Sequence, residues 1–206
     1  MAEARRPRAA TEEKRRRILD AAEEIMLKEG YAAISSRSVA TAVGIQAPLV
    51  HYYFASLDDL FVAVLQRRAG KNVERMTEAL ASPEPLRAWW ELASDPRGTA
   101  LFVELLAAAN HRPALKVELG GIARDVRRMQ VTMLQTLLPE YGIDPDDLPP
   151  PLVAAGIQGL AFSAVQDLAA GYDTSPDEAI AAMSRLVDRL ESRRKASGLR
   201  RPGRAP

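Results

Sequence analysis

The residues best suited to recognition chemistry lie in one short stretch, VGIQAPLVHYYFAS, over residues 43–56. His51, Tyr52, Tyr53 and Phe54 place four rings in succession in a chain with only 5% Phe, Trp and Tyr. Imidazole and phenol groups form hydrogen bonds, and ring faces offer apolar contact. An exposed aromatic face on so short a segment is costly unless it docks on something. The stretch therefore predicts a binding surface.

Other chemistries lack the residues they need. The chain has no cysteine, which excludes disulfides and thiolate zinc sites and fits a reducing cytoplasm. Its two histidines, His51 and His111, have no carboxylate three or four residues further on, so we predict no metal site. His111 is expected in a loop before Pro113. The sequence has no HExxH, glycine-rich phosphate loop or Ser-His-Asp setting, and we predict neither an enzyme nor a cofactor.

Charge is unevenly placed along the chain, although the net charge is only +1. Arginines and lysines gather before residue 18 and after residue 192, with an acidic loop between them over residues 140–147. A basic terminus can mark a polyanion partner, although a solvated end explains the C-terminal tail equally well. The N-terminus has no apolar signal core, and no apolar run reaches about 18 residues. We expect a cytoplasmic protein that does not enter a membrane.

The elements that must position the ring-rich stretch are helices. Thr11 is expected to cap a helix that ends at Gly30, with apolar residues at helical spacing between them. A short helix over residues 37–43 ends at Gly44, and another helix begins near Ala47. Two short helices joined by a tight turn containing glycine are typical of a helix-turn-helix.

Spacing separates a core face from an exposed face in this helix-turn-helix. The residues expected in its small core are Tyr31, Ile34, Val39, Ala40, Ile45 and Val50. The opposite face of the last helix carries Gln46, Ala47, Leu49, His51, Tyr52 and Tyr53. The alternative is that the tyrosines pack against neighbouring helices and that His51 is a solvent-facing residue without a partner.

With these residues in place, the chain resembles the tetracycline-repressor (TetR) family of one-component bacterial regulators. Residues 18–61, ILDAAEEIMLKEGYAAISSRSVATAVGIQAPLVHYYFASLDDLF, carry the resemblance. The parts of the family pattern occur in order: a first helix ending in Gly-aromatic, the Arg-Ser-Val-Ala helix, Gly44-Ile45, the aromatic run and a Ser-capped fourth helix. The rest of the chain resembles the family through its all-helical plan.

The resemblance implies a role for each residue of the exposed face. It places Ala47, Pro48, Leu49 and Tyr52 near base edges and Arg37 where the family often makes a base contact. The residues implied to hold phosphates are Ser36, His51 and Tyr53, and Gln46 completes the predicted DNA-binding set. Family members commonly carry a phosphate-contacting lysine where this chain has Leu57, followed by two acids that repel DNA. The basic arm before Thr11 could compensate for that loss.

The family plan implies an all-α fold of about nine helices. Residues 1–10 are expected to be a flexible basic arm, 11–56 a three-helix DNA-binding domain, 57–195 a larger ligand-binding and dimerisation domain, and 196–206 a flexible basic tail. The last two helices form a four-helix bundle across a two-fold axis in the family. The predicted pairing residues are a small-residue stripe of Gly156, Gly159 and Ser163 and an apolar seam of Ile180, Met183, Val187 and Leu190. Ordinary packing within one chain is the alternative.

An effector pocket is expected among the middle helices. Its candidate lining consists of Trp89, Phe102, Leu106, Asn110, Met129, Met133, Gln158 and Phe162. Most of the apolar members also fit a plain core. Neighbouring helical residues point about 100 degrees apart, so we expect only one of Trp89 and Trp90 to face the pocket. The methionines suggest a small, largely apolar effector.

These expectations together predict a ligand-responsive DNA-binding regulator of transcription. We predict a repressor, which binds a pseudo-palindromic operator as a homodimer and is released from it by an effector. The alternatives are an activator of the same fold and a helical interaction protein without specific DNA binding.

Overall fold

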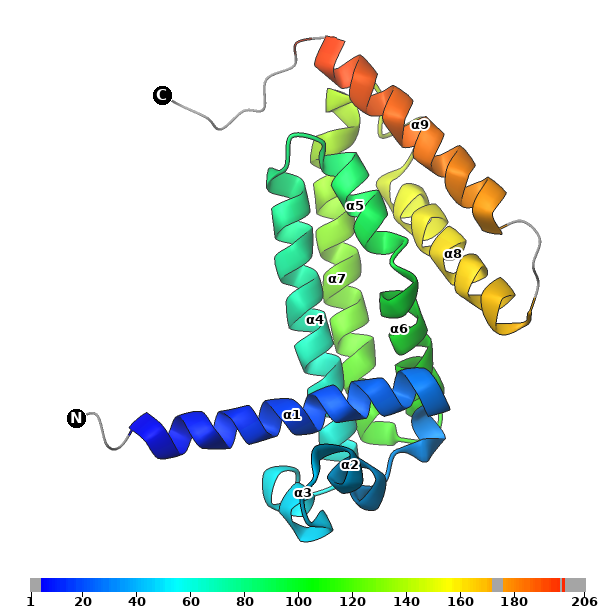
Figure 1. Ribbon diagram of the computed structural model, residues 1–206. Helices are drawn as coiled ribbons and strands as arrows, with labels where there is room; N and C mark the ends of the chain where they lie inside the picture. The colour runs from blue at the N-terminus through cyan, green and yellow to red at the C-terminus, as the bar shows by residue number, and fades with distance from the viewer. Residues whose placement is uncertain (1–4, 172–175, 197, 199–206) are drawn as a thin grey trace. The chain divides into compact units, whose positions relative to one another are not determined.

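The computed structural model describes residues 5–171, 176–196 and 198, and every regular element within these ranges is a helix (Figure 1). The all-α prediction is therefore confirmed. In chain order the elements are α1 (Arg5–Glu29), the 3-10 turn η1 (Tyr31–Ala33), α2 (Ser36–Val43), α3 (Ala47–Tyr53), α4 (Leu57–Ala81), α5 (Pro85–Ala93), α6 (Pro96–Ala109), α7 (Pro113–Glu140), α8 (Pro150–Ala169) and α9 (Pro176–Ala196).

The first helix begins earlier than the sequence suggested. α1 starts at Arg5, so Thr11 lies inside the helix and the predicted arm of residues 1–10 is helical from Arg5 onward. The intervening residues are mostly alanine and arginine, which are strong helix formers, and Pro7 lies in the first turn, where it removes no intrahelical bond. Most of the predicted tail over residues 196–206 lies outside the described residues.

Two compact units divide the chain, and each is described separately. The N-terminal unit consists of residues 1–71 and 100–122, and the C-terminal unit of residues 72–99 and 123–206. The chain therefore passes between the two units three times, after residues 71, 99 and 122. Residues 100–122 join the N-terminal unit because their apolar side chains enter its core: Leu101, Leu105, Ala108, Ala109 and Leu115.

The core of the N-terminal unit is built around α1. Ile18, Ala22 and Met26 are buried along one face of α1, at the predicted helical spacing. They pack with residues from α2, α3 and α4, among them Val39, Val50 and Phe61. Of the predicted helix-turn-helix core, Ile34, Val39, Ala40 and Val50 are buried, and Tyr31 and Ile45 are half-buried against the same cluster.

Local caps fix the ends of α2 and the start of α4. Ser35 and Ser38 form a reciprocal capping box at the start of α2, and Gly44 ends the helix with a φ of 73°. A left-handed backbone of this kind favours glycine, which explains why the turn contains one. At the start of α4, the Ser56 backbone N–H donates to Asp59 Oδ2 at 2.9 Å and the Asp59 N–H donates to Ser56 Oγ at 3.1 Å. These bonds depend on residues three apart and are readable from sequence.

The core of the C-terminal unit joins α5, α7, α8 and α9. Its buried members include Trp89, Trp90, Leu134, Ile157 and Val187. Both tryptophans are buried, at 2% and 3% exposure, and Trp90 Nε1 donates to Ser184 Oγ at 2.9 Å. Both rings are buried because α5 packs on both α8 and α9. The placement of one tryptophan at an effector pocket stays a prediction.

The predicted apolar seam of α9 lies against its own unit. Val187 is buried in that core, and Ile180, Met183 and Leu190 pack against it partly buried. Val187 therefore contributes to the core of one chain, whereas Ile180, Met183 and Leu190 keep exposed surface, and the role of the seam in pairing stays a prediction. Helical spacing reveals an apolar stripe but not the surface that covers it. The stripe of small residues on α8, Gly156, Gly159 and Ser163, is exposed.

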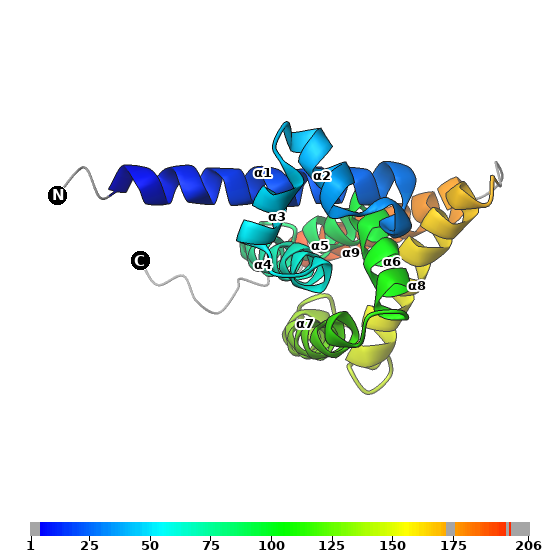
Figure 2. The same cartoon turned by 90° about the horizontal axis from the view of Figure 1, so that it is seen from below.

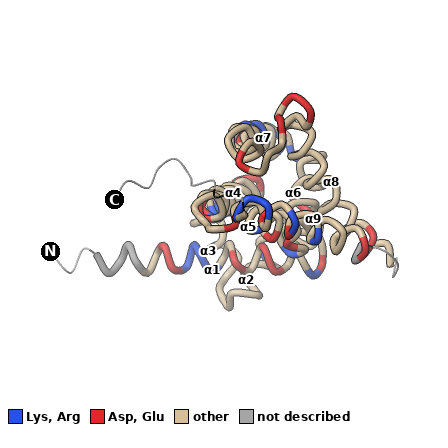
Figure 3. Tube along the Cα trace, turned by 90° about the horizontal axis from the view of Figure 1, so that it is seen from above, with Lys and Arg blue, Asp and Glu red and all other residues tan. Residues whose placement is uncertain are grey.

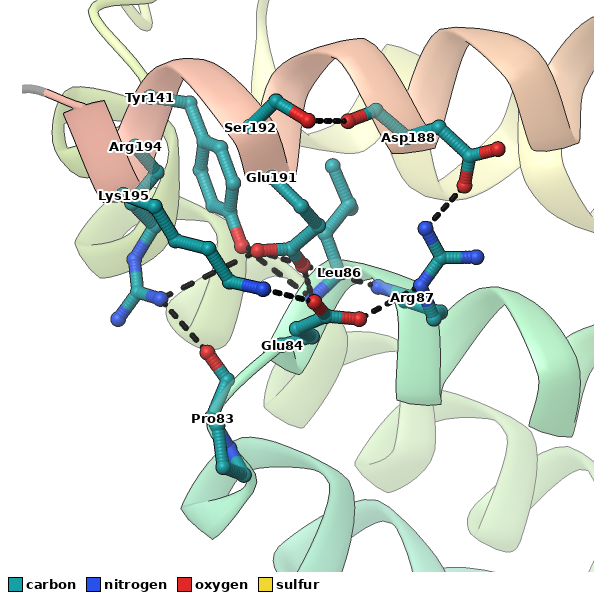
Figure 4. Close-up of polar contacts among 10 residues, drawn as sticks. All are labelled: Pro83, Glu84, Leu86, Arg87, Tyr141, Asp188, Glu191, Ser192, Arg194 and Lys195. Carbon is teal, nitrogen blue, oxygen red and sulfur yellow. Dashed lines mark hydrogen bonds and ion pairs between the residues drawn. The ribbon is translucent and has the colours of Figure 1, made fainter.

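A buried carboxylate anchors α9 to the start of α5 (Figure 4). Glu191 is only 1% exposed, and its Oε1 accepts from the backbone N–H of Leu86 at 2.9 Å and of Arg87 at 3.1 Å. The Tyr141 hydroxyl donates to the same oxygen at 2.8 Å. Burial, and then the bond to Glu191, raises the pKa of the Tyr141 phenol. Glu191 thus satisfies first-turn N–H groups of α5 from a distant helix.

Arginines and a lysine surround this carboxylate. Arg194 Nε donates to Glu140 Oε2 at 3.0 Å and lies with Nη1 4.0 Å from Glu191 Oε2. Arg87 pairs with Asp188, and Lys195 pairs with Glu84. The cluster therefore links the ends of α5, α7 and α9.

Within the described residues, no single helix is long and apolar enough to cross a membrane, and one bent pair, α3 with α4, meets those criteria jointly.

Candidate nucleic-acid interface

The α2–α3 surface presents most of its polar and aromatic groups outward. α3 contains no Asp, Glu, Lys or Arg, and α2 contains only Arg37. Accordingly, the α2–α3 stretch is drawn mostly in tan, the colour of residues other than Lys, Arg, Asp and Glu (Figure 3). Of the nine predicted DNA-binding residues, the exposed ones are Arg37, Gln46, Pro48, His51 and Tyr52, and the half-buried ones are Ser36, Ala47, Leu49 and Tyr53.

A hydrogen bond joins the two helices at this surface. Ser36 Oγ and His51 Nε2 are 2.9 Å apart, linking the first turn of α2 to α3. The family resemblance implies phosphate contacts for both residues, and the structure places them side by side. One of the two groups donates to the other, so a neutral Ser36–His51 pair keeps one O–H or N–H group to donate to a phosphate oxygen.

Tyr52 is the most prominent apolar group on this face. Its side chain is 75% exposed, although Val50, two residues earlier, is buried. The rings of Tyr52 and Tyr53 meet edge to face, with centroids 5.2 Å apart and planes at 89°. This contact holds Tyr52 in place without burying it, so the ring remains available to a partner.

Arg37 is free to act on a partner. It is exposed at the start of α2, and within the described residues it forms no hydrogen bond or ion pair. A guanidinium of this kind can pair with guanine O6 and N7.

Two basic residues of α1 hold the helix-turn-helix in place, a role that sequence reasoning missed. Arg17 donates from Nη2 to the carbonyl of Val43 at 2.9 Å, at the C-terminal end of α2. Arg15 lies over the ring of Phe54, 5.1 Å from its centroid, at the C-terminal end of α3. Cations are favourable at helix C-termini because the helix dipole is negative there. In both ribbon views the N-terminal turns of α1 extend past α2 and α3 (Figures 1 and 2).

The end of α6 and the turn that follows it also contact the helix-turn-helix region and the start of α4. The Tyr31 backbone N–H donates to Glu104 Oε2 at 2.7 Å, and the Tyr31 ring stacks on His111 with centroids 6.4 Å apart. Arg112 pairs with Asp58 at the start of α4 and lies 4.4 Å from the centroid of the Phe61 ring. No sequence signal identified these contacts, because their partners are more than 50 residues apart.

Arg112→Gln should weaken the contact between the turn after α6 and the start of α4. We expect the free energy of unfolding of the N-terminal unit to fall by about 1 kcal/mol, since one ion pair and one cation–π contact are lost. Amide hydrogen exchange in the first turns of α4 would measure the loss. Arg128→Gln is the matched control, because the Arg128–Asp125 pair is largely exposed. Equal protection in both variants would show that Arg112 does not hold α4.

The C-terminal unit contains a cavity of about 660 Å³ beside α7. It includes two of the predicted ligand-binding residues, Met129 and Met133. Its lining consists of Leu80, Asp125, Arg128, Met129, Thr132, Met133, Thr136, Leu137 and Glu140. Hydrophobic side chains with a few hydroxyl and charged groups are typical of small-molecule sites.

The other predicted ligand-binding residues lie elsewhere. Trp89 is buried in the core of the C-terminal unit and is absent from the cavity lining. Gln158 and Phe162 are half-buried on α8. Phe102 and Leu106 belong to α6 and Asn110 to the turn that follows it, all in the N-terminal unit, where Leu106 and Asn110 are exposed.

Comparison with known proteins gives a consistent result. Residues 18–64 match the family model described as "Bacterial regulatory proteins, tetR family". Over 73 residues the chain is 33% identical to the HTH-type transcriptional activator FasR of Mycolicibacterium smegmatis. That match covers 35% of this chain and 33% of FasR, so it spans about a third of that protein.

Solved structures extend the similarity beyond the helix-turn-helix. A TetR-family member from Streptomyces coelicolor A3 is 25% identical with a TM-score of 0.58, covering 86% of this chain and 98% of the other. The multidrug binding protein EbrR, complexed with imidazole, is 27% identical with a TM-score of 0.56, covering 86% and 94%. The similarity to both therefore includes helices of the second unit.

Proposed function

We propose that the chain is a member of the tetR family of bacterial regulatory proteins, whose model its residues 18–64 match, and that it regulates transcription by binding a specific operator. The observation that carries the proposal is the exposed α2–α3 face, with the Ser36–His51 bond, the 75% exposed Tyr52 and an unpaired Arg37. In this proposal it acts in the bacterial cytoplasm and catalyses no reaction.

Base reading and phosphate binding fall to different parts of this face. Ala47, Pro48 and Leu49 have no side-chain hydrogen-bond donor, so thymine methyl groups should lie beneath them. Arg37 supplies the polar base contact, and the Ser36–His51 pair, Gln46 and Tyr53 contact the backbone. The basic N-terminal turns of α1, which extend past α2 and α3, supply further phosphate contacts in place of the lysine that Leu57 replaces.

The protein binds as a homodimer on a pseudo-palindromic site in this proposal. One helix-turn-helix makes few base contacts, and two related half-sites double them. The exposed small-residue stripe of α8 is the surface assigned to pairing. The predicted seam of α9, whose Ile180, Met183 and Leu190 are only partly buried, is assigned to the same role.

Regulation is proposed to come from a small molecule bound in the C-terminal unit. The cavity beside α7 supports this, as does the imidazole complex of EbrR. An effector changes DNA affinity only through its different affinity for the two protein conformations, typically by about 1–3 kcal/mol of coupling. We propose repression relieved by the effector. The activator FasR favours the second candidate, activation by the same fold.

Selection of bound DNA from a random pool tests the proposal. Recovery of an inverted repeat with fixed spacing is the expected result, and binding without sequence preference would contradict it. In vitro transcription from a promoter carrying the selected site then separates the candidates. A fall in transcript supports repression, and a rise supports activation.

Arg37→Ala should weaken operator binding by roughly 1–3 kcal/mol and relax the preference at one base pair of each half-site. Fluorescence anisotropy on the selected operator and its single-base variants measures both effects. Arg124→Ala removes an equal charge from an exposed position on α7 and should change little. If the two variants bind alike, Arg37 is a surface charge without a base contact.

A further inference from the structure

The proposed DNA-binding surface carries little fixed positive charge. α3 contains no Asp, Glu, Lys or Arg, α2 contains only Arg37, and the first turn of α4 adds two acids, Asp58 and Asp59. Affinity for DNA comes largely from cations placed on phosphates, so a residue that gains a charge at this surface has a large effect on binding. His51 is the one side chain of α2 and α3 that can gain a positive charge near neutral pH.

His51 lies where a positive charge is favourable. It is exposed in the last turn of α3, and the negative end of the helix dipole favours a cation there. Its Nε2 is 2.9 Å from Ser36 Oγ, in the first turn of α2. This bond fixes the orientation of the ring. The other ring nitrogen, Nδ1, forms no hydrogen bond within the described residues.

Protonation changes how many donors the Ser36–His51 pair presents. A neutral imidazole has one N–H group and one acceptor nitrogen, so the neutral pair keeps a single donor after its internal bond is made. In a protonated imidazole both nitrogens donate. Nε2–H then donates to Ser36 Oγ, and the Ser36 hydroxyl and the His51 Nδ1–H are both left to donate. The protonated pair therefore offers two donors and a positive charge, which suit phosphate oxygens.

The helices around α3 do not supply an anion for this charge. The charged and titratable groups that they carry at the helix-turn-helix are Arg15 and Arg17 of α1, Arg37 of α2, Tyr52 and Tyr53 of α3, and Asp58 and Asp59 of α4. The two acids are already bonded, Asp58 to Arg112 and Asp59 to Ser56. No described carboxylate pairs with His51, so a DNA phosphate is the anion that balances a protonated ring.

We infer that operator binding takes up a proton at His51, so that the affinity of this protein for DNA rises as the pH falls through the range in which histidine gains its charge. The sign follows from linkage: DNA binds the protonated pair more tightly than the neutral pair, so acid strengthens DNA binding and DNA favours protonation by the same factor. The contact of the pair with the DNA backbone rests on the proposed function. The operator is then held more tightly at lower pH.

Fluorescence anisotropy of the full chain on the selected operator tests this inference between about pH 5.5 and pH 7.5. We expect the Kd to fall roughly tenfold per half-site across this range, because a charged donor binds phosphate more strongly than a neutral one. Ionic strength is held constant, since salt screens every phosphate contact. The chain has only two histidines and no cysteine, so few other groups change charge in this range.

His51→Gln keeps an acceptor for Ser36 and a donor for phosphate but cannot gain a charge. We expect its Kd to be nearly the same at both ends of the pH range. His111→Gln is the matched control, because it replaces the other histidine, whose ring stacks on Tyr31, and it should keep the pH dependence of the unmodified chain. The inference is overturned if the unmodified chain binds with the same Kd at both pH values, or if His51→Gln retains the pH dependence.

Nuclear magnetic resonance of the two imidazole rings gives a readout that a purely structural role for His51 would not change. The His51 ring should stay protonated to a higher pH in the operator complex than in the free chain. The His111 ring should titrate alike in both states. A His51 ring that also titrates alike in both states would contradict proton uptake at this residue.

The same pH series on a duplex of unrelated sequence separates this inference from the proposed function, because phosphates carry no sequence information. If both duplexes bind equally, and His51→Gln abolishes the pH dependence, the inference holds and specific operator binding does not. Operator binding that is independent of pH contradicts only the inference. A chain that binds neither duplex contradicts both.

Discussion

Replacing Glu191 by alanine should lower the free energy of unfolding of the C-terminal unit by roughly 3–5 kcal/mol, since it breaks a buried charged network. The substitution leaves the N–H groups of Leu86 and Arg87 and the hydroxyl of Tyr141 without their shared acceptor. Two of these donors are buried, so water does not readily replace the carboxylate. Urea unfolding followed by tryptophan fluorescence measures this unit selectively.

Glu191→Gln is the matched control for this experiment. It keeps an oxygen that can accept from α5 and from Tyr141 but removes the negative charge at the helix start. We expect a clearly smaller loss, on the order of 1–2 kcal/mol. A loss below about 1 kcal/mol for the alanine variant would mean that Glu191 does not hold α9 on α5.

Gly159→Glu should convert the proposed dimer to a monomer and weaken operator binding by about 100-fold or more, because two half-sites would no longer be bound by one linked molecule. The proposed pairing surface would bury two carboxylates near the two-fold axis without partners. A Cβ atom at Gly159 meets no heavy atom within 4 Å, so the single chain accommodates the side chain. Analytical ultracentrifugation and anisotropy on the selected operator measure both effects.

Gly70→Glu provides a matched control for the pairing experiment. Gly70 is an exposed helical glycine of α4, and a Cβ atom there also meets nothing within 4 Å. That variant should remain dimeric. If Gly159→Glu also remains dimeric at micromolar concentration, the pairing surface lies elsewhere.

Local signals in the sequence were sufficient to predict the helix-turn-helix. The capping serines, the left-handed Gly44 and the spacing of Val39 and Val50 act over a few residues, so their outcome is nearly independent of the rest of the chain. The start of α1 was misplaced for a related reason. Thr11 is a good cap, but the residues before it also favour helix, and a sequence pattern does not rank the two.

Tertiary contacts decided the features that periodicity left open. The apolar stripe of α9 fits a dimer seam or an internal core equally well, and only the packing of α5 and α8 against it shows that Val187 is buried within the chain. The burial of both tryptophans has the same origin. A hydrophobic pattern records that a face avoids water but carries no information on which surface covers it.

The sequence by itself determined the all-helical fold, the helix-turn-helix and the set of residues on its exposed face, since each follows from neighbours within one or two turns. Only the tertiary structure decided the partners of Glu191 and Arg112. Tyr141 and Glu191 are 50 residues apart, and Asp58 and Arg112 are 54 apart. The charge of such a residue can be read from the sequence. Its contribution to the free energy of folding depends on its burial and on the acceptor or donor that folding brings next to it.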